Sequence, residues 1–120
     1  MSPRRLRLLF ALGFPLGALS HGWYVYRFGW LGHPERPAWA PWFWYGLSAA
    51  DFAVAALLVA RPRAGLVAGN ALMAASLTVN WFVFDSFARG FNGVVFVLTS
   101  FGAAFAGATP WLWRRSGRPA

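Results

Sequence analysis

The sequence predicts an all-α membrane protein with four antiparallel transmembrane helices in a compact bundle and both termini in the cytoplasm. The first observation behind this prediction is composition, since 58% of the 120 residues are hydrophobic and 12% are charged. Soluble domains have about 45–50% apolar and about 25% charged residues. A chain of this length cannot bury so much apolar surface in its own core, because small domains have a high surface-to-volume ratio. We therefore expect one transmembrane domain over residues 1–120, with the lipid bilayer as its partner.

The second observation is that the chain divides into four apolar segments, each near the roughly 20 residues that a helix needs to cross the hydrocarbon core. The first segment follows three arginines, and the second ends at an Arg-Pro-Arg turn too short for anything but a tight hairpin to the third segment. The fourth ends at an arginine pair. A proline-rich and tryptophan-rich outer loop, residues 29–40, separates the first two segments, and proline forbids a continuous helix there. The predicted helices cover about residues 6–28, 41–60, 64–84 and 91–113.

The third observation is the distribution of the eleven basic residues, which are all arginine. Positive side chains accumulate on the cytoplasmic side of a membrane protein. An even number of crossings then places both termini in the cytoplasm, in a membrane of the bacterial inner type. An alternative is cleavage of residues 1–20 as a signal peptide, because small residues precede His21. The cytoplasmic arginines are Arg4, Arg5, Arg7, Arg61, Arg63, Arg114, Arg115 and Arg118, against Arg27, Arg36 and Arg89 outside.

Several function classes are disfavoured by what the sequence contains. The net charge of +8 comes from arginine clusters between apolar segments, so we expect no nucleic-acid partner. The absence of cysteine excludes disulfides and thiolate metal sites. His33 and Glu35 in the outer loop are too few ligands for a metal site. No nucleotide-binding, hydrolase or metalloprotease motif occurs, so we expect no cofactor and assign no catalytic residue.

Polar residues at membrane depth are the candidate site. Asp51 is near the middle of the second predicted helix, where an ionisable residue is costly and therefore suggests a function. His21 and Asn80 are in the outer halves of the first and third predicted helices, with Tyr24 and Ser48 each one turn from a member of the set. These five residues are predicted to form an outward-opening ligand or proton site, or else a set of structural hydrogen bonds. Asp85, at the outer membrane edge, is expected to be solvated.

Small residues at a spacing of four predict close helix packing. Gly13 and Gly17 form one such pair, and Gly65 and Gly69 form another. These faces would serve the bundle itself, a homo-oligomer or a contact with a larger membrane protein.

Three functional classes are compatible with these patterns. The small size and heavy aromatic content favour a non-enzymatic accessory or structural component of a membrane complex. The first alternative is a small proton-linked transporter or ligand-binding membrane protein that uses His21 and Asp51. The second is a membrane enzyme acting on a lipid-like substrate with the same two side chains as acid and base.

Overall fold

The computed structural model describes residues 1–30, 37–83 and 93–117, and within them the chain is all-helical, as predicted. Three helices, α1, α2 and α4, are long and apolar enough to cross a membrane. The third helix has 17 residues and continues directly into five residues of π-helix, labelled η1. The elements are α1 (Pro3–Phe28), α2 (Ala40–Ala60), α3 (Pro62–Thr78), η1 (Val79–Val83) and α4 (Gly93–Arg115).

Helix α1 begins three residues before the predicted start because its first turn is capped. The Ser2 hydroxyl accepts a hydrogen bond from the backbone N–H of Arg5 at 3.3 Å, and Pro3 occupies the first turn, where its missing N–H costs nothing. The helix ends at Gly29, whose φ of 75° is a conformation that glycine adopts without a Cβ clash. The N–H of Gly29 donates to the carbonyl of Val25 at 2.7 Å. Local capping therefore sets both ends.

The third predicted segment, residues 64–84, corresponds to α3 together with η1. At the junction, the Asn80 side chain donates a hydrogen bond to the carbonyl oxygen of Ser76 at 2.8 Å. Side chains that insert into the backbone ladder accompany local changes from α- to π-helix. The expected last turn, with Asp85 and Arg89, lies outside the described residues.

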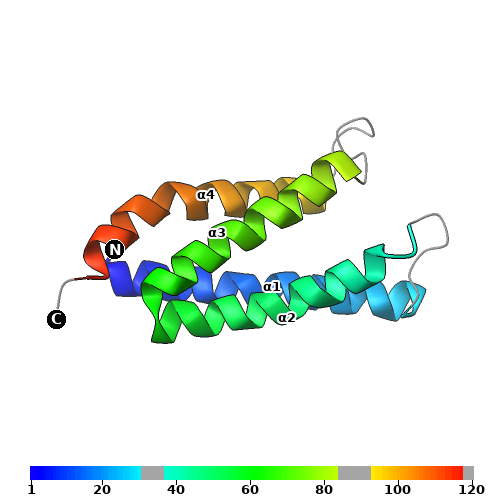
Figure 1. The fold of residues 1–120 in the computed structure, drawn as a ribbon, viewed down its shortest axis with the longest axis horizontal. Helices are drawn as coiled ribbons and strands as arrows, with labels where there is room; N and C mark the ends of the chain where they lie inside the picture. The colour runs from blue at the N-terminus through cyan, green and yellow to red at the C-terminus, as the bar shows by residue number, and fades with distance from the viewer. Residues whose placement is uncertain (31–36, 84–92, 118–120) are drawn as a thin grey trace.

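Figure 1 shows that the four helices lie side by side, with consecutive helices running in opposite directions. Both ends of the described chain are at the same end of the molecule, beside the turn between α2 and α3. We call this the arginine end, because Arg61 and Arg63 flank that turn. Helices α1 and α2 remain together along their length, whereas α3 and η1 diverge from them toward the opposite end, which we call the aromatic end (Figure 1).

Four phenylalanine rings join α1 to α4 in the core. Phe10 and Phe14 of α1 meet Phe101 and Phe105 of α4 edge to face, with ring centroids 5.1–5.8 Å apart. Such pairs contribute roughly 0.5–1.5 kcal/mol each beyond the area they bury. Phe105 is fully buried. A Cβ added to Gly69 of α3 would lie 2.7 Å from the Phe105 ring, so the cluster depends on that glycine.

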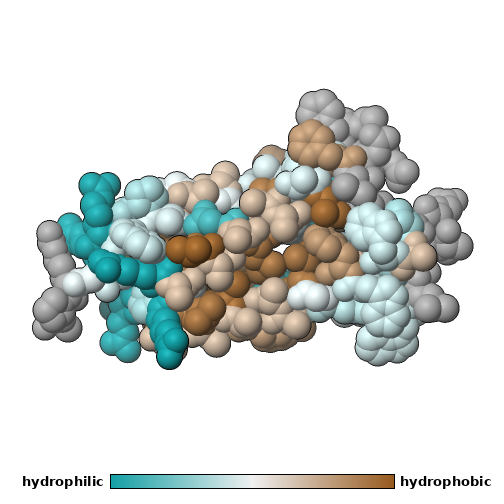
Figure 2. Space-filling view, viewed as in Figure 1, coloured by the Kyte–Doolittle hydropathy of each residue, from teal (hydrophilic) through white to brown (hydrophobic). Residues whose placement is uncertain are grey.

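The outer surface is apolar in the middle and polar at the arginine end. Figure 2 shows hydrophilic residues gathered at that end, followed by a broad hydrophobic zone over the central part of the helices. Large apolar side chains such as Leu12, Leu16 and Phe52 are more than half exposed. This pattern is typical of a surface that faces hydrocarbon rather than water.

Candidate functional site

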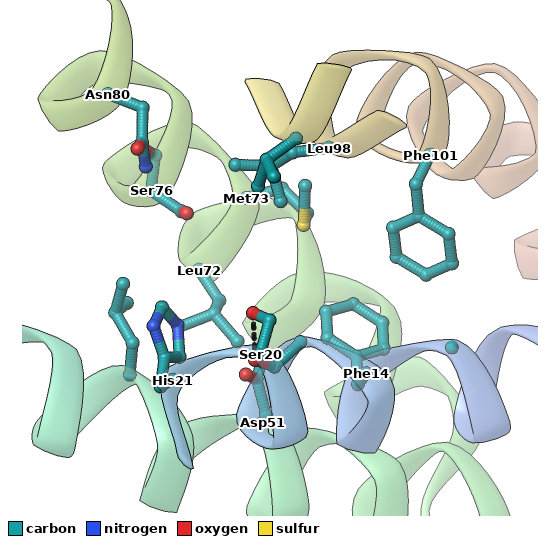
Figure 3. Close-up of a pocket in the computed structure, with 14 residues that line it drawn as sticks. Phe14, Ser20, His21, Asp51, Leu72, Met73, Ser76, Asn80, Leu98 and Phe101 are labelled. Carbon is teal, nitrogen blue, oxygen red and sulfur yellow. Dashed lines mark hydrogen bonds between the residues drawn. The ribbon is translucent and has the colours of Figure 1, made fainter. Parts of the chain in front are cut away.

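A cavity of about 90 Å³ lies where α3 and α4 begin to separate from α1 and α2. All four helices contribute to its lining, which is apolar except for one group of side chains. Figure 3 shows Ser20, His21 and Asp51 on one side of this space and Ser76 and Asn80 on the other. The polar residues that line the cavity are Ser20, His21, Asp51, Ser76 and Asn80.

Asp51 reaches the cavity because it occupies the inward face of α2. Leu47, Val54 and Leu58 are buried on the same face, at helical spacing from Asp51. Only 8% of the Asp51 surface is exposed, and the carboxyl group has no hydrogen-bond or ion-pair partner within residues 1–30, 37–83 and 93–117. The α1 backbone passes close by at Gly17, where an added Cβ would lie 3.1 Å from Asp51 Oδ2. Because Gly17 has no side chain, the Asp51 carboxyl group fits against the α1 backbone at this position.

His21 lies one helical turn after Gly17 on the same helix. Its imidazole stacks against the indole of Trp44 from α2, with ring centroids 6.2 Å apart and planes inclined by 20°. The neighbouring Ser20 hydroxyl donates to the carbonyl of Gly17 at 2.6 Å, the bond drawn in Figure 3. The α1 wall thus presents an imidazole and a hydroxyl group to the cavity.

The opposite wall comes from the end of α3 and the beginning of η1. Ser76 is buried, and Asn80 is one turn farther on and bonded to its carbonyl. Trp81 fixes this wall to α4, because its indole N–H donates to the hydroxyl of Thr99 at 2.9 Å. A second cross-helix bond, from Asn70 to the hydroxyl of Thr109 at 2.8 Å, ties α3 to α4 nearer the arginine end.

The cavity opens into a wider cleft of about 690 Å³ at the aromatic end. Ser20, His21 and Asn80 line both spaces, so the polar wall continues from one into the other. The remaining lining of the cleft is mainly aromatic, with Tyr24 and Trp44 meeting at a centroid distance of 4.7 Å. The other aromatic and charged residues of the cleft are Trp23, Phe28 and Arg27.

The structure brings part of the predicted site together. His21, Asp51 and Asn80 line the same cavity, and Tyr24 lines the outer cleft. Ser48 is not among the lining residues; its hydroxyl donates to the carbonyl of Trp44 at 3.0 Å. Two cavity residues, Ser76 and Ser20, were not predicted from the sequence. Ser76 could have been found from helical spacing, because it lies one turn before Asn80, whereas Ser20 is simply adjacent to His21.

The four predicted packing glycines all face other helices of the same chain. Gly65 makes the closest backbone approach, since an added Cβ would lie 2.5 Å from the backbone nitrogen of Leu58 in α2. The other contacts are Gly13 with Phe101, Gly17 with Asp51, and Gly69 with Phe105 and Phe14. The loop residues His33 and Glu35 lie outside the described part of the chain. Within that part, no group of three His, Cys, Asp or Glu side chains has the arrangement of a metal site.

A buried carboxyl, an imidazole, an amide and two hydroxyl groups around one small space provide donors and acceptors for a small polar or charged solute. The outer cleft provides an apolar, aromatic route to that space. Comparisons with protein-family models, with curated proteins and with solved structures found no match to this chain.

Proposed function

We propose that this chain is a multi-pass protein of a bacterial-type inner membrane that binds a small solute in a cleft open to the outer face. In this proposal α1, α2 and α4 cross the bilayer as one bundle with α3, which reaches the length of a crossing by continuing into η1. By the positive-inside rule, the arginines of the arginine end support a cytoplasmic position for that end and for the two chain ends beside it. The aromatic end then faces outward, where Trp and Tyr favour the headgroup layer.

The observation that carries the binding function is the position of Asp51. A carboxyl group near the middle of an apolar helix is expensive in lipid, and side chains of this kind mark substrate or ion pathways. Asp51 lines a cavity instead of packing against a donor within the described residues. A purely structural aspartate is expected to accept hydrogen bonds from neighbouring helices. A proton-linked transporter is the form of this function that would also use His21.

An accessory role in a larger complex, which the sequence favours, is the competing proposal. The accessory role requires the exposed apolar surface to be covered by a partner protein in place of lipid. It does not explain why polar side chains line a cavity. No feature of the described residues favours the lipid-enzyme alternative.

Cysteine accessibility tests the binding proposal, because the natural chain has no cysteine and each variant carries a single thiol. Ser20→Cys places the thiol in the shared lining of cavity and cleft. Phe52→Cys is a matched control, since Phe52 follows Asp51 directly but has 56% of its surface exposed on the lipid side. Thiols react as thiolates, which require water.

We expect a charged, membrane-impermeant thiosulfonate added from the outer side to modify Ser20→Cys at least tenfold faster than Phe52→Cys. Equal rates at the two positions, or no reaction at Ser20→Cys, would leave the cleft closed to water and favour the accessory role. Reaction of Ser20→Cys from the cytoplasmic side alone would reverse the proposed orientation.

A further inference from the structure

We infer that the solute is a small organic monocation, with its ammonium group beside Asp51 in the inner cavity and its apolar part in the aromatic cleft. This inference rests on the binding function proposed above and assigns the chemical class of the ligand. Four features carry it: the charge of the site, the size of the cavity, the walls of the cleft and the charge at its mouth.

The charge of the inner cavity is set by Asp51. Among the described residues that line it there is no arginine, and His21 is the only other ionisable one. A buried carboxylate requires a positive partner or several hydrogen-bond donors, because burial removes its hydration. The described protein residues supply neither to Asp51. A bound ammonium group supplies both a positive charge and up to three N–H donors.

The size of the inner cavity limits what can reach Asp51. Its volume of about 90 Å³ is smaller than the roughly 150 Å³ cavity that accepts benzene in a protein core. An ammonium or methylammonium group fits this space, whereas an aromatic ring does not. The outer cleft, at about 690 Å³, falls in the range of roughly 300–1,000 Å³ that is usual for small-molecule sites. The ligand therefore has a small charged head and a larger remainder.

The cleft between the outer face and Asp51 is suited to an apolar cation. Its described lining is mainly aromatic, with Tyr24 and Trp44 among the residues; aromatic side chains accept apolar groups, and π faces that are open attract cations. The indole of Trp44 also stacks on His21, at the passage from cleft to cavity. An alkylammonium ion can thus exchange hydration for aromatic contacts before it reaches the carboxyl group.

Arg27 restricts the opposite end of the ligand. Among the described residues it is the only arginine in the lining of the cleft, and it lies about 15 Å along α1 from Gly17, the residue beside Asp51, at about 1.5 Å per residue. A second positive charge at the far end of the ligand would be repelled there. The structure therefore favours a monocation over a dication long enough for its second charge to reach Arg27.

The test measures binding of n-butylammonium to the full chain in lipid nanodiscs by isothermal titration calorimetry, with empty nanodiscs as background. n-Butanol serves as the neutral probe of the same shape. We expect n-butylammonium to bind at least tenfold more tightly than n-butanol. Asp51→Asn is expected to weaken its binding at least tenfold, while Ser48→Ala, on the same helix but outside the cavity lining, leaves it unchanged.

Gly17→Ala provides a second variant that keeps the charge of Asp51. Its methyl group lies 3.1 Å from Asp51 Oδ2 and narrows the approach to the carboxyl group, so binding of n-butylammonium is expected to fall about threefold or more. Circular dichroism and thermal unfolding establish that each variant is folded.

Three results would overturn the inference. Equal binding of n-butanol and n-butylammonium would show that the cleft has no preference for a charged ligand. The proposed binding function would then stand, but the inferred class of ligand would be wrong. Binding of n-butylammonium that survives in both Asp51→Asn and Gly17→Ala would place the cation elsewhere. If no probe binds although Ser20→Cys is accessible from outside, the inferred ligand class is wrong, while the proposal of a water-accessible cleft is retained. If Ser20→Cys is inaccessible, the proposed function itself is wrong.

Discussion

At the arginine end of the molecule helix backbones touch, whereas at the aromatic end the two helix pairs are separated by a cleft. Gly65 meets the backbone of Leu58 at the arginine end, and the guanidinium of Arg63 lies 5.3 Å from the centre of the Trp113 ring. Toward the aromatic end, residues of α1, α2, η1 and α4 line an open cleft of about 690 Å³ instead.

The difference shows that the closest helix–helix contacts are at the arginine end, whereas the cleft is at the aromatic end. Between apolar helices in lipid, packing and a few hydrogen bonds replace the hydrophobic effect as the source of association. Close glycine contacts and the four-phenylalanine cluster supply that packing in the arginine half. The polar cavity begins directly beyond the cluster, because Phe14 and Phe101 belong to both. The packed phenylalanine cluster therefore forms one boundary of the polar cavity.

The largest expected effect is loss of the phenylalanine cluster. Phe105→Ala removes a fully buried ring that meets two others edge to face, and we expect a loss of about 3 kcal/mol in the free energy of unfolding. Unfolding by sodium dodecyl sulfate in mixed micelles, followed by circular dichroism, measures it. Phe52→Ala is the control, because that ring is exposed and its loss should change stability by less than about 0.5 kcal/mol. Similar losses in both variants would remove the distinction between buried and exposed rings.

The next effect contrasts two glycines directly. Gly65→Ala forces the backbones of α2 and α3 apart, with an expected cost of about 2 kcal/mol. Gly22→Ala meets open space within a helix, so higher helix propensity should raise stability by up to about 1 kcal/mol. The same unfolding assay decides the comparison. Destabilisation of the two variants by equal amounts would contradict the difference between a glycine at a backbone contact and a glycine with open space beside it.

The smallest expected effect concerns the link between η1 and α4. Trp81→Phe keeps an aromatic ring but removes the indole N–H that donates to Thr99, and such bonds between membrane helices contribute about 1 kcal/mol or less. Amide hydrogen exchange should accelerate in η1 while α1 and α2 stay protected, because the bond serves only the α3–η1–α4 side.

A double-mutant cycle with Thr99→Val isolates this hydrogen bond from other contacts of the tryptophan. Additive effects of the two substitutions would show that the hydrogen bond does not stabilise the open end.

Much of the architecture follows from the sequence alone. The length of the apolar segments predicts four helices, and the described helices agree with them to within a few residues at the ends that are described. The early start of α1 could have been read from Ser2-Pro3, a capping pair at a helix start. The glycine spacing predicts close packing, but it does not say which partner each glycine meets.

The inward faces of the helices are what the sequence does not reveal. In a soluble helix the apolar stripe identifies the buried side, whereas in a membrane helix lipid-facing and inward-facing positions are both apolar. Ser48 and Ser76 are therefore equivalent in the sequence, yet only Ser76 lines the cavity. Length, charge and local capping determined the helices and their ends, because these depend on neighbouring residues. Only the tertiary structure decided how each helix is rotated and where the pairs separate, since both depend on packing between segments distant in the chain.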